Sequence, residues 1–282
     1  FEVHVRNLKL AEDVDLEFFS KQTPGFSGAD IANVCNEAAL IAARNGKQSI
    51  EKSDFLAAID RIIGGLEKRG NIISPDEKKT IAIHESGHAT VSWMLKHASP
   101  LVKVTIVPRG KSLGAAWYLP EERHITTTEQ LMDEMAALLG GRAAEEVLIG
   151  KVSTGALNDL ERATKQAYAM VVYYGLSKLG NISYYDSSGE REYSFSKPYS
   201  EKTAEEIDRE VHSIIDEAYQ TAKKILSENK DKLTQLAKQL QEKEVIFTED
   251  MEKIYGKRAF EIENIEQPKE DKTTENSENI TA

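Results

Sequence analysis

Apolar residues recur along most of the chain at the three- and four-residue spacing of helices that bury one face. Two such stripes predict helices over residues 29–44 and over about 53–64, with Ser27 placed to cap the first and Gly64-Gly65 to end the second. The stripe residues are Ile31, Val34, Cys35, Ala38 and Ala42 in the first helix, and Phe55, Leu56, Ile59, Ile62 and Ile63 in the second. Together they indicate a small helical module over residues 1–66.

A third helix is predicted to begin at Pro75. The segment Ser74-Pro75-Asp76-Glu77 combines a capping box, a proline at the first helical position and acidic residues in the first turn. Apolar residues then surround the helix on nearly every side, which is typical of a buried helix. Gly87 in its middle costs ~1 kcal/mol relative to alanine, so we expect another segment to approach closely there. Charged residues within 67–75 indicate a linker before this helix.

The rest of the pattern predicts more helices and one small sheet. Residues 1–5 alternate like a strand fragment. Strands are expected at 102–107 and 114–120, and helices at 128–139, 143–148, 158–174, from a capping box at Thr203-Ala204-Glu205-Glu206, and around Leu233, Leu236 and Leu240. The fold class is therefore mainly α, with a mostly helical unit over 76–258 that contains a small β-sheet.

Composition adds limits to this fold. The 282 residues are 40% hydrophobic, which is enough for two cores, and the single cysteine, Cys35, fits a core position in a reducing compartment. A net charge of −11 argues against nucleic acid as a partner. No stretch approaches the ~18 apolar residues of a membrane span, so the chain as given is expected to be soluble. Residues 259–282 are acidic, poor in apolar residues and expected to be disordered.

The five residues His84-Glu85-Ser86-Gly87-His88 carry the strongest chemical signal. They fit H-E-x-x-H, in which histidines four apart differ by about 40° around a helix and can reach one zinc ion. Glu85 lies beside them and can act as the general base that takes a proton from a zinc-bound water. A chance or purely structural occurrence of the pattern is the alternative, which the helical context disfavours.

A catalytic zinc site needs a third protein ligand, and spacing leaves several candidates. His97 lies half a helical turn from His88, and His4 and His212 belong to other elements. The candidates that remain are His124, Glu145, Glu146 and Asp159. Gly110-Lys111-Ser112 is similar to the end of a phosphate-binding loop, but Thr105 stands where its first glycine is required, so no ATP hydrolysis is expected from this chain alone.

Five blocks at ordered spacing resemble the FtsH family. They are Thr23 to Arg44, His84 to Ala89 (HESGHA), Lys103 to Gly110 (KVTIVPRG), Gly140 to Glu146 (GGRAAEE) and Ser153 to Asp159 (STGALND). The resemblance covers residues 1 to about 255. It implies a membrane-anchored, ATP-dependent zinc metalloprotease, in which an AAA+ ring unfolds proteins and passes them to a peptidase ring.

The resemblance implies roles for parts and residues of the chain. Residues 1–66 would be the helical lid of the AAA+ ATPase, and 76–258 the zinc metallopeptidase. Asp159 would be the third zinc ligand beside His84 and His88, and Glu145 would orient a ligand histidine. Gly28 and Ala29 would touch nucleotide in the full-length protein.

Cofactors, partners and location follow from the same resemblance. One Zn²⁺ is expected in each chain, whereas ATP and Mg²⁺ are expected only in the full-length protein. The expected partners are unfolded, misfolded or membrane protein substrates and five further copies in a homohexamer. In the full-length protein, an N-terminal anchor that this chain lacks would hold the protein at the cytoplasmic face of the bacterial inner membrane.

Two further expectations concern the site, and two alternative functions stay open. An exposed edge strand beside the metal would bind extended peptides with little sequence selectivity, although an ordinary hairpin is an equally good interpretation. Ser86 stands where the family usually has alanine. Its hydroxyl faces neither ligand position and can bond to the carbonyl four residues earlier, so little functional change is expected. Two other functions remain open: a non-catalytic ring-assembly scaffold, and a zinc peptidase that needs no ATPase.

Overall fold

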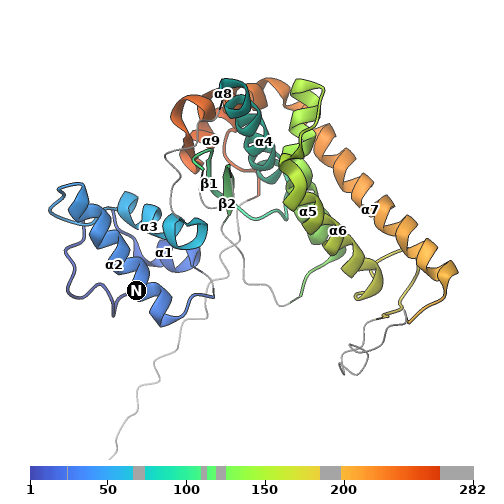
Figure 1. Ribbon diagram of the computed structural model, residues 1–282, viewed down its shortest axis with the longest axis horizontal. Coiled ribbons are helices and arrows are strands. Elements are labelled where there is room, and N and C mark those ends of the chain that lie inside the picture. Colours follow the sequence, from blue (N-terminus) through green and yellow to red (C-terminus); the bar gives the residue numbers. More distant parts are fainter. Residues whose placement is uncertain (24, 66–73, 109–112, 119–124, 185–197, 261–282) are drawn as a thin grey trace, which may run out of the picture.

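The computed structural model in Figure 1 describes residues 1–23, 25–65, 74–108, 113–118, 125–184 and 198–260, and is mainly helical as predicted. In chain order its elements are α1 (Leu16–Gln22), α2 (Gly28–Arg44), α3 (Lys52–Gly64), α4 (Pro75–Met94), β1 (Leu101–Thr105), β2 (Ala115–Tyr118), α5 (Thr128–Ile149), a 3-10 turn (Thr154–Ala156), α6 (Leu157–Val172), α7 (Glu201–Glu228), α8 (Lys230–Lys243), β3 (Val245–Phe247) and α9 (Thr248–Tyr255). The acidic tail beyond residue 260, most of the linker, His124 and Gly110-Lys111-Ser112 lie outside the described residues.

Helices α1–α3 form an N-terminal module with its own core (Figure 1). The rings of Phe19 and Phe55 stack at 4.8 Å between centroids, and Cys35 is buried in the stripe of α2, as expected. Ser27 caps α2 through a capping box with Asp30. The strand expected at residues 1–5 is wrong: these residues form turns, because Phe1 folds back against Phe19 and Phe55 and Val5 is buried in the same core.

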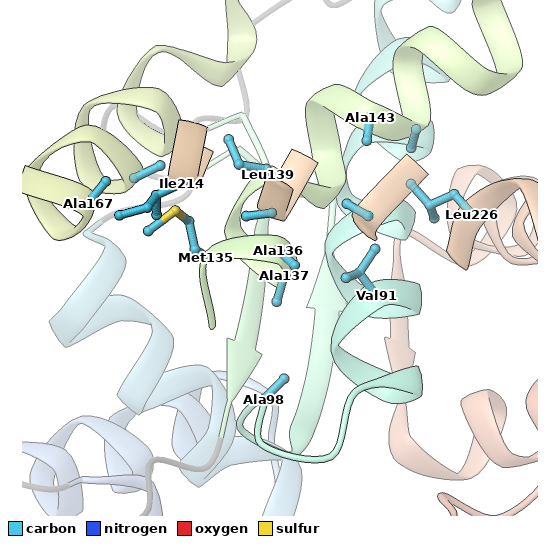
Figure 2. Packing of buried hydrophobic residues seen from close by; sticks show 14 of the residues in the cluster. Val91, Ala98, Met135, Ala136, Ala137, Leu139, Ala143, Ala167, Ile214 and Leu226 are labelled. Atoms are coloured by element: carbon cyan, nitrogen blue, oxygen red, sulfur yellow. The ribbon is translucent and has the colours of Figure 1, made fainter. Parts of the chain in front are cut away.

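Helices α4–α9 and the sheet form a C-terminal module. Helix α5 packs along both α4 and α7, and α6 packs against α7 and α5. Figure 2 shows the resulting core, in which Val91 of α4, Met135 and Leu139 of α5, and Leu226 of α7 meet. Small side chains such as Ala136, Ala143 and Ala167 separate the larger ones. Alanine at these positions lets the helices approach one another closely.

Helix α5 is continuous, whereas two helices with a break at residues 140–142 were expected. The helix continues through both glycines, and the first of them, Gly140, lies at a close crossing with α4. A Cβ on Gly87 would lie 2.3 Å from the carbonyl oxygen of Gly140, and one on Gly140 would lie 2.8 Å from the carbonyl oxygen of Gly87. This contact confirms the close approach expected at Gly87 and explains glycine at both positions.

The sheet has the strand order β2-β1-β3, and both pairs are antiparallel. Strands β1 and β2 lie within the predicted segments 102–107 and 114–120, apart from the start of β1 at Leu101. Strand β3 and helix α9 were not predicted, because three and eight residues are too short for a clear period. One face of the sheet packs with α4, α8 and α9 in a second core that includes Val104, Leu240 and Ile246.

Helix α7 begins earlier than predicted. Ser200 is its N-cap and accepts a hydrogen bond from the backbone N–H of Thr203, so the expected start at Thr203 is wrong. Ser200 lies three residues before Thr203, and both residue types favour the cap position. No helix among the described residues combines the length and the apolar composition that crossing a bilayer requires.

Candidate metal centre

Helix α4 carries His84, Glu85 and His88 in its buried middle. Its capping box of Ser74 and Glu77 and its proline at the first position fix where the helix begins. Residues 82–93 are all buried, and each of the three motif side chains is about 8% exposed. The two imidazoles therefore project from successive turns into a site that little water reaches.

The structure brings Asp159 to the two histidines. The Nε2 atoms of His84 and His88 are 3.1 Å apart, and Asp159 Oδ2 lies 3.3 Å from the first and 3.5 Å from the second. A tetrahedral zinc ion with bonds of ~2.0–2.1 Å places its ligand atoms ~3.3–3.4 Å from one another. These three atoms thus fit one face of a zinc coordination tetrahedron and leave a fourth position for water or substrate.

Each histidine is oriented through its other ring nitrogen. Nδ1 of His84 lies 2.7 Å from Oε1 of Glu145, and Nδ1 of His88 lies 2.9 Å from the carbonyl oxygen of Ala137. A carbonyl can only accept, so His88 carries its proton on Nδ1, and its Nε2 is free to bind a metal. Ser153 holds Glu145 in turn, with its backbone N–H 2.6 Å from Oε2 and its hydroxyl 3.0 Å from Oε1.

Asp159 comes from a different part of the chain. It lies in the first turn of α6, directly after the 3-10 turn that Ser153 caps. The positive end of the α6 dipole favours a carboxylate at this position. Ser153 therefore contributes to the site twice, because it caps the 3-10 turn that leads into α6 and donates to the Glu145 carboxylate beside His84.

The other candidate ligands lie elsewhere. Glu146 accepts hydrogen bonds from Tyr219 at 2.5 Å and from Lys223 at 2.7 Å. His97 follows the end of α4, and His4 and His212 are exposed. Glu145 points at His84 Nδ1, a position from which it orients the ring. Gly28 and Ala29 start α2 in the N-terminal module and are not among the residues that line the metal cleft.

The electrostatics of the site favour a charged carboxylate beside the histidines. Burial raises the pKa of Asp159, but its hydrogen bonds with His84 and His88 outweigh this and hold that pKa below its usual range. Burial likewise lowers the pKa of His84, yet the hydrogen bonds to Asp159 and Glu145 raise it to about 9. For Glu85, burial raises the pKa and the nearby histidines only partly oppose it. The Glu85 carboxylate is therefore a better proton acceptor than an exposed glutamate.

Two glycines that the sequence did not single out shape this site. A Cβ on Gly141 would lie 2.5 Å from Nε2 of both His84 and His88, so only a hydrogen atom fits there. A Cβ on Gly114 would lie 2.7 Å from Oε1 of Glu85. The GG pair of α5 was visible in the sequence, but only the packing of α5 on α4 shows that one glycine faces the crossing and the next faces the metal ligands.

The site opens into a cleft of about 940 Å³. This cleft is lined by His84, Glu85, His88, the start of α6 with Asp159, and strand β2, whose Tyr118 belongs to its wall. Burial, with the Glu85 and Asp159 carboxylates nearby, raises the pKa of Tyr118 far above its usual range. Tyr118 is therefore neutral at physiological pH and was another feature that sequence reasoning missed.

Ser86, between the motif residues, differs from the expectation. Its side chain is fully buried, and among the described residues its hydroxyl has no hydrogen-bond partner. The structure therefore lacks the bond to the carbonyl of Ala82 that the sequence allowed, and the expectation of little functional change stays a prediction. The backbone carbonyl of Ser86 accepts a hydrogen bond from the Thr90 hydroxyl at 2.7 Å.

Comparison with known proteins agrees with this geometry. Residues 71–254 match peptidase family M41, and residues 13–57 match the AAA+ lid domain. The chain is 63% identical over 284 aligned positions to the ATP-dependent zinc metalloprotease FtsH of Parabacteroides distasonis, covering 99% of this chain and 41% of that protein. It is 48% identical to the mouse mitochondrial inner membrane m-AAA protease component AFG3L2, over 92% of this chain and 33% of that protein. The chain thus spans about two fifths or less of these relatives, and it belongs to peptidase family M41, as part of the FtsH family of zinc metalloproteases.

Proposed function

We propose that this chain is the proteolytic portion of an ATP-dependent zinc metalloprotease that hydrolyses unfolded, misfolded or membrane proteins. The observation that carries the proposal is the triangle of donor atoms from His84, His88 and Asp159, whose sides of 3.1, 3.3 and 3.5 Å suit one zinc ion per chain. Two oriented imidazoles and one carboxylate are a donor set typical of catalytic zinc, because a fourth position stays open.

The chain's own residues divide the work of peptide hydrolysis. When bound, zinc lowers the pKa of a water molecule to ~7 and polarises the scissile carbonyl. Glu85 lines the cleft beside the ligands, so its carboxylate can take the proton from the attacking water and pass it to the leaving amine. Glu145 and Ser153 keep His84 in position throughout.

Strand β2 is proposed to bind the substrate. It is an edge strand of the sheet and contributes Ala115, Ala116 and Tyr118 to the wall of the metal cleft. An extended peptide that pairs with this edge would be held through its backbone, which gives weak sequence selectivity. Such binding requires an unfolded segment, and that requirement suits a peptidase supplied by an unfolding ATPase.

The remaining parts of the proposal rest on the family. Residues 1–66 are proposed to be the AAA+ lid, with Gly28 and Ala29 near the nucleotide, and 76–258 the peptidase domain. The relatives' names describe ATP-dependent proteases and an inner-membrane component, which supports ATP dependence and a membrane location. A membrane-anchored homohexamer that uses Mg²⁺ with ATP is proposed from the resemblance to the FtsH family. In bacteria the ring would face the cytoplasm. The sequence contains no Walker A loop, so this chain alone should not hydrolyse ATP.

The test separates the enzyme from the ring-assembly scaffold. Glu85→Gln should lower casein hydrolysis by ~100-fold or more, the range of a general base, while zinc content and oligomeric state stay unchanged. Unchanged turnover would contradict the role given to Glu85. A chain that binds no zinc and cleaves nothing would favour the scaffold.

A second pair of variants tests the third ligand. Asp159→Asn should lose zinc and chelator-sensitive hydrolysis together, because an amide oxygen is a weaker and uncharged ligand. Glu161→Gln is the matched control: it lies two residues further along α6 and its carboxylate pairs with exposed Lys165. Full zinc content and activity in Asp159→Asn would move the third ligand elsewhere.

A further inference from the structure

Strand β2 lies between the N-terminal module and the metal cleft. Ala116 and Tyr118 line the cleft and pack against the core of the C-terminal module. Trp117, between them, packs against the core of the N-terminal module instead. This division follows from the pleat, because successive side chains of a strand point to opposite faces. A shift of the N-terminal module against the sheet would therefore move the strand that forms one wall of the cleft.

A buried ion pair joins the two modules at the same place. Nζ of Lys103 in β1 lies 2.6 Å from an oxygen of Asp60 in α3, and the two residues are 4% and 8% exposed. Lys103 lies directly opposite Trp117 in the β1–β2 register, and its ammonium is 5.3 Å from the centroid of the indole ring. That distance suits a cation–π contact. The three side chains thus form one contact that spans α3, β1 and β2.

Few other contacts in the described part of the chain join the two modules. Among the described residues, no helix of the N-terminal module packs along an element of the C-terminal module in the way that α4 packs along α5. Figure 1 shows α1–α3 as a separate group beside the sheet. A small contact area makes the relative position of the modules sensitive to a single buried pair, since removal of one partner leaves the other charge buried.

We propose that Asp60, Lys103 and Trp117 form a joint through which the N-terminal module sets the position of β2, and with it the peptide-binding edge of the metal cleft. Lys103 and Trp117 act on the cleft through the strand pair and are therefore positioning residues. The inference rests on the proposed function, because it assigns the moved edge to peptide binding. It also supplies a path by which lid movement in an ATPase reaches the peptidase.

The test uses Asp60→Asn in this chain, loaded with zinc. Hydrogen exchange at the amides of residues 115–118 should become ~10-fold faster, because the variant removes the Asp60 charge that pairs with Lys103 and the sheet edge loosens. For a short unstructured peptide, KM should rise ~10-fold while kcat stays within ~2-fold, since the change affects binding and leaves the ligands and Glu85 in place. Zinc content should not change.

Glu37→Gln is the matched control, because it removes the ion pair with Arg61 inside the N-terminal module. It should leave exchange at β2 and KM unchanged, and an equal effect there would overturn the specific role of the joint. Unchanged exchange and KM in Asp60→Asn would overturn it directly. The double variant Asp60→Asn/Lys103→Met removes both charged side chains of the joint, so exchange at β2 should stay faster than in wild type. A return to the wild-type rate would overturn the joint, because it would show that an uncompensated charge alone caused the effect of Asp60→Asn.

A second variant and a control on wild type cover the cases in which Asp60→Asn does not fold or the chain has no activity. If Asp60→Asn does not fold, Trp117→Leu loosens the same joint without a buried charge; faster exchange at residues 115–118 then supports the joint, and unchanged exchange overturns it. If wild type binds no zinc and cleaves no peptide, the proposed function fails, and the exchange measurement alone decides whether the N-terminal module positions β2.

Discussion

Helices α2 and α4 both begin with a capping box, but α2 buries only apolar residues, whereas α4 also buries polar ones. Helix α2 buries one apolar stripe that includes Val34, Cys35 and Ala38, while much of its surface stays exposed. Helix α4 buries residues 82–93 without a break, including two histidines, a glutamate and two serines. The comparison shows two ways in which a helix is specified: α2 by the period of its apolar residues, and α4 by partners for its polar ones.

Most of the buried polar side chains in α4 have a hydrogen-bond partner on another segment. His84 has Glu145, His88 has the Ala137 carbonyl, Thr90 has the Tyr255 hydroxyl at 2.7 Å, and Ser92 donates to the Ser99 carbonyl at 2.8 Å. Buried polar groups without such bonds destabilise a fold, so the neighbours of α4 are constrained in position as well as in size. Substitutions around α4 should therefore have larger effects than comparable ones around α2.

The largest effect is expected from Gly141→Ala. The added Cβ would lie 2.5 Å from the Nε2 atoms of both histidines and force them away from the third ligand. We expect zinc affinity to fall by more than the ~10–100-fold seen when an orienting partner is lost, and hydrolysis to fall with it. A zinc titration against a competing chelator measures this, with circular dichroism as the check on folding. Wild-type affinity would show that the histidines adjust freely.

Gly87→Ala and Gly28→Ala form a matched pair across the two helices. A Cβ on Gly87 would lie 2.3 Å from the Gly140 carbonyl oxygen, whereas one on Gly28 in the first turn of α2 meets nothing within 4 Å. We expect Gly87→Ala to lower the free energy of unfolding by ~3 kcal/mol and Gly28→Ala to change it by less than ~0.5 kcal/mol. Urea unfolding of both variants measures these free energies. Equal changes in the two variants would contradict the predicted difference between α4 and α2.

Glu145→Gln tests whether orientation matters apart from ligation. A glutamine at this position can still approach His84 but lacks the charge that strengthens the bond, so zinc affinity should fall ~10-fold or more. Glu146→Gln is the control, since the neighbouring carboxylate binds Tyr219 and Lys223 instead. Equal losses of zinc in the two variants would mean that net charge, and not the contact with His84, sets the affinity.

The smallest effect on zinc content and hydrolysis is expected from a substitution of Ser86 in α4. Its buried hydroxyl has no hydrogen-bond partner among the described residues, so Ser86→Ala should raise the free energy of unfolding by ~1 kcal/mol. Zinc content and hydrolysis should stay at the wild-type level. A lower free energy of unfolding would show that the hydroxyl is bonded in solution, for example to water.

The sequence predicted those features that depend on neighbouring residues. The caps at Ser27 and Ser74 and the strand at 102–107 are set by short segments, and H-E-x-x-H places two donors on one helix turn by geometry alone. The resemblance to the FtsH family pointed to Asp159, which spacing could not select from four candidates. The structure places its carboxylate within 3.5 Å of both ring nitrogens.

What the sequence could not supply depends on contacts between distant segments. Gly140 and Gly141 suggested a break because glycine weakens an isolated helix, yet the crossing with Gly87 requires Gly140 and the nearby rings of His84 and His88 require Gly141. The Lys103–Asp60 pair joins residues 43 positions apart, and nothing local marks either as buried. Strand β3 is recognisable only beside β1, because three residues carry no period of their own.

The pairing of β1 with β3 has a consequence for how the protein is made. β1 is the central strand, yet Lys103 pairs with Phe247, and the Thr248 hydroxyl donates to the Leu101 carbonyl at 2.9 Å. Arg258 donates to the Leu95 carbonyl just beyond the end of α4. During synthesis from the N-terminus, the helix with both histidines therefore emerges long before the segment that covers its back. In a nascent chain, the contacts that hold the back of this helix would form only after residue 258 has left the ribosome, so the proposed metal site would be completed late.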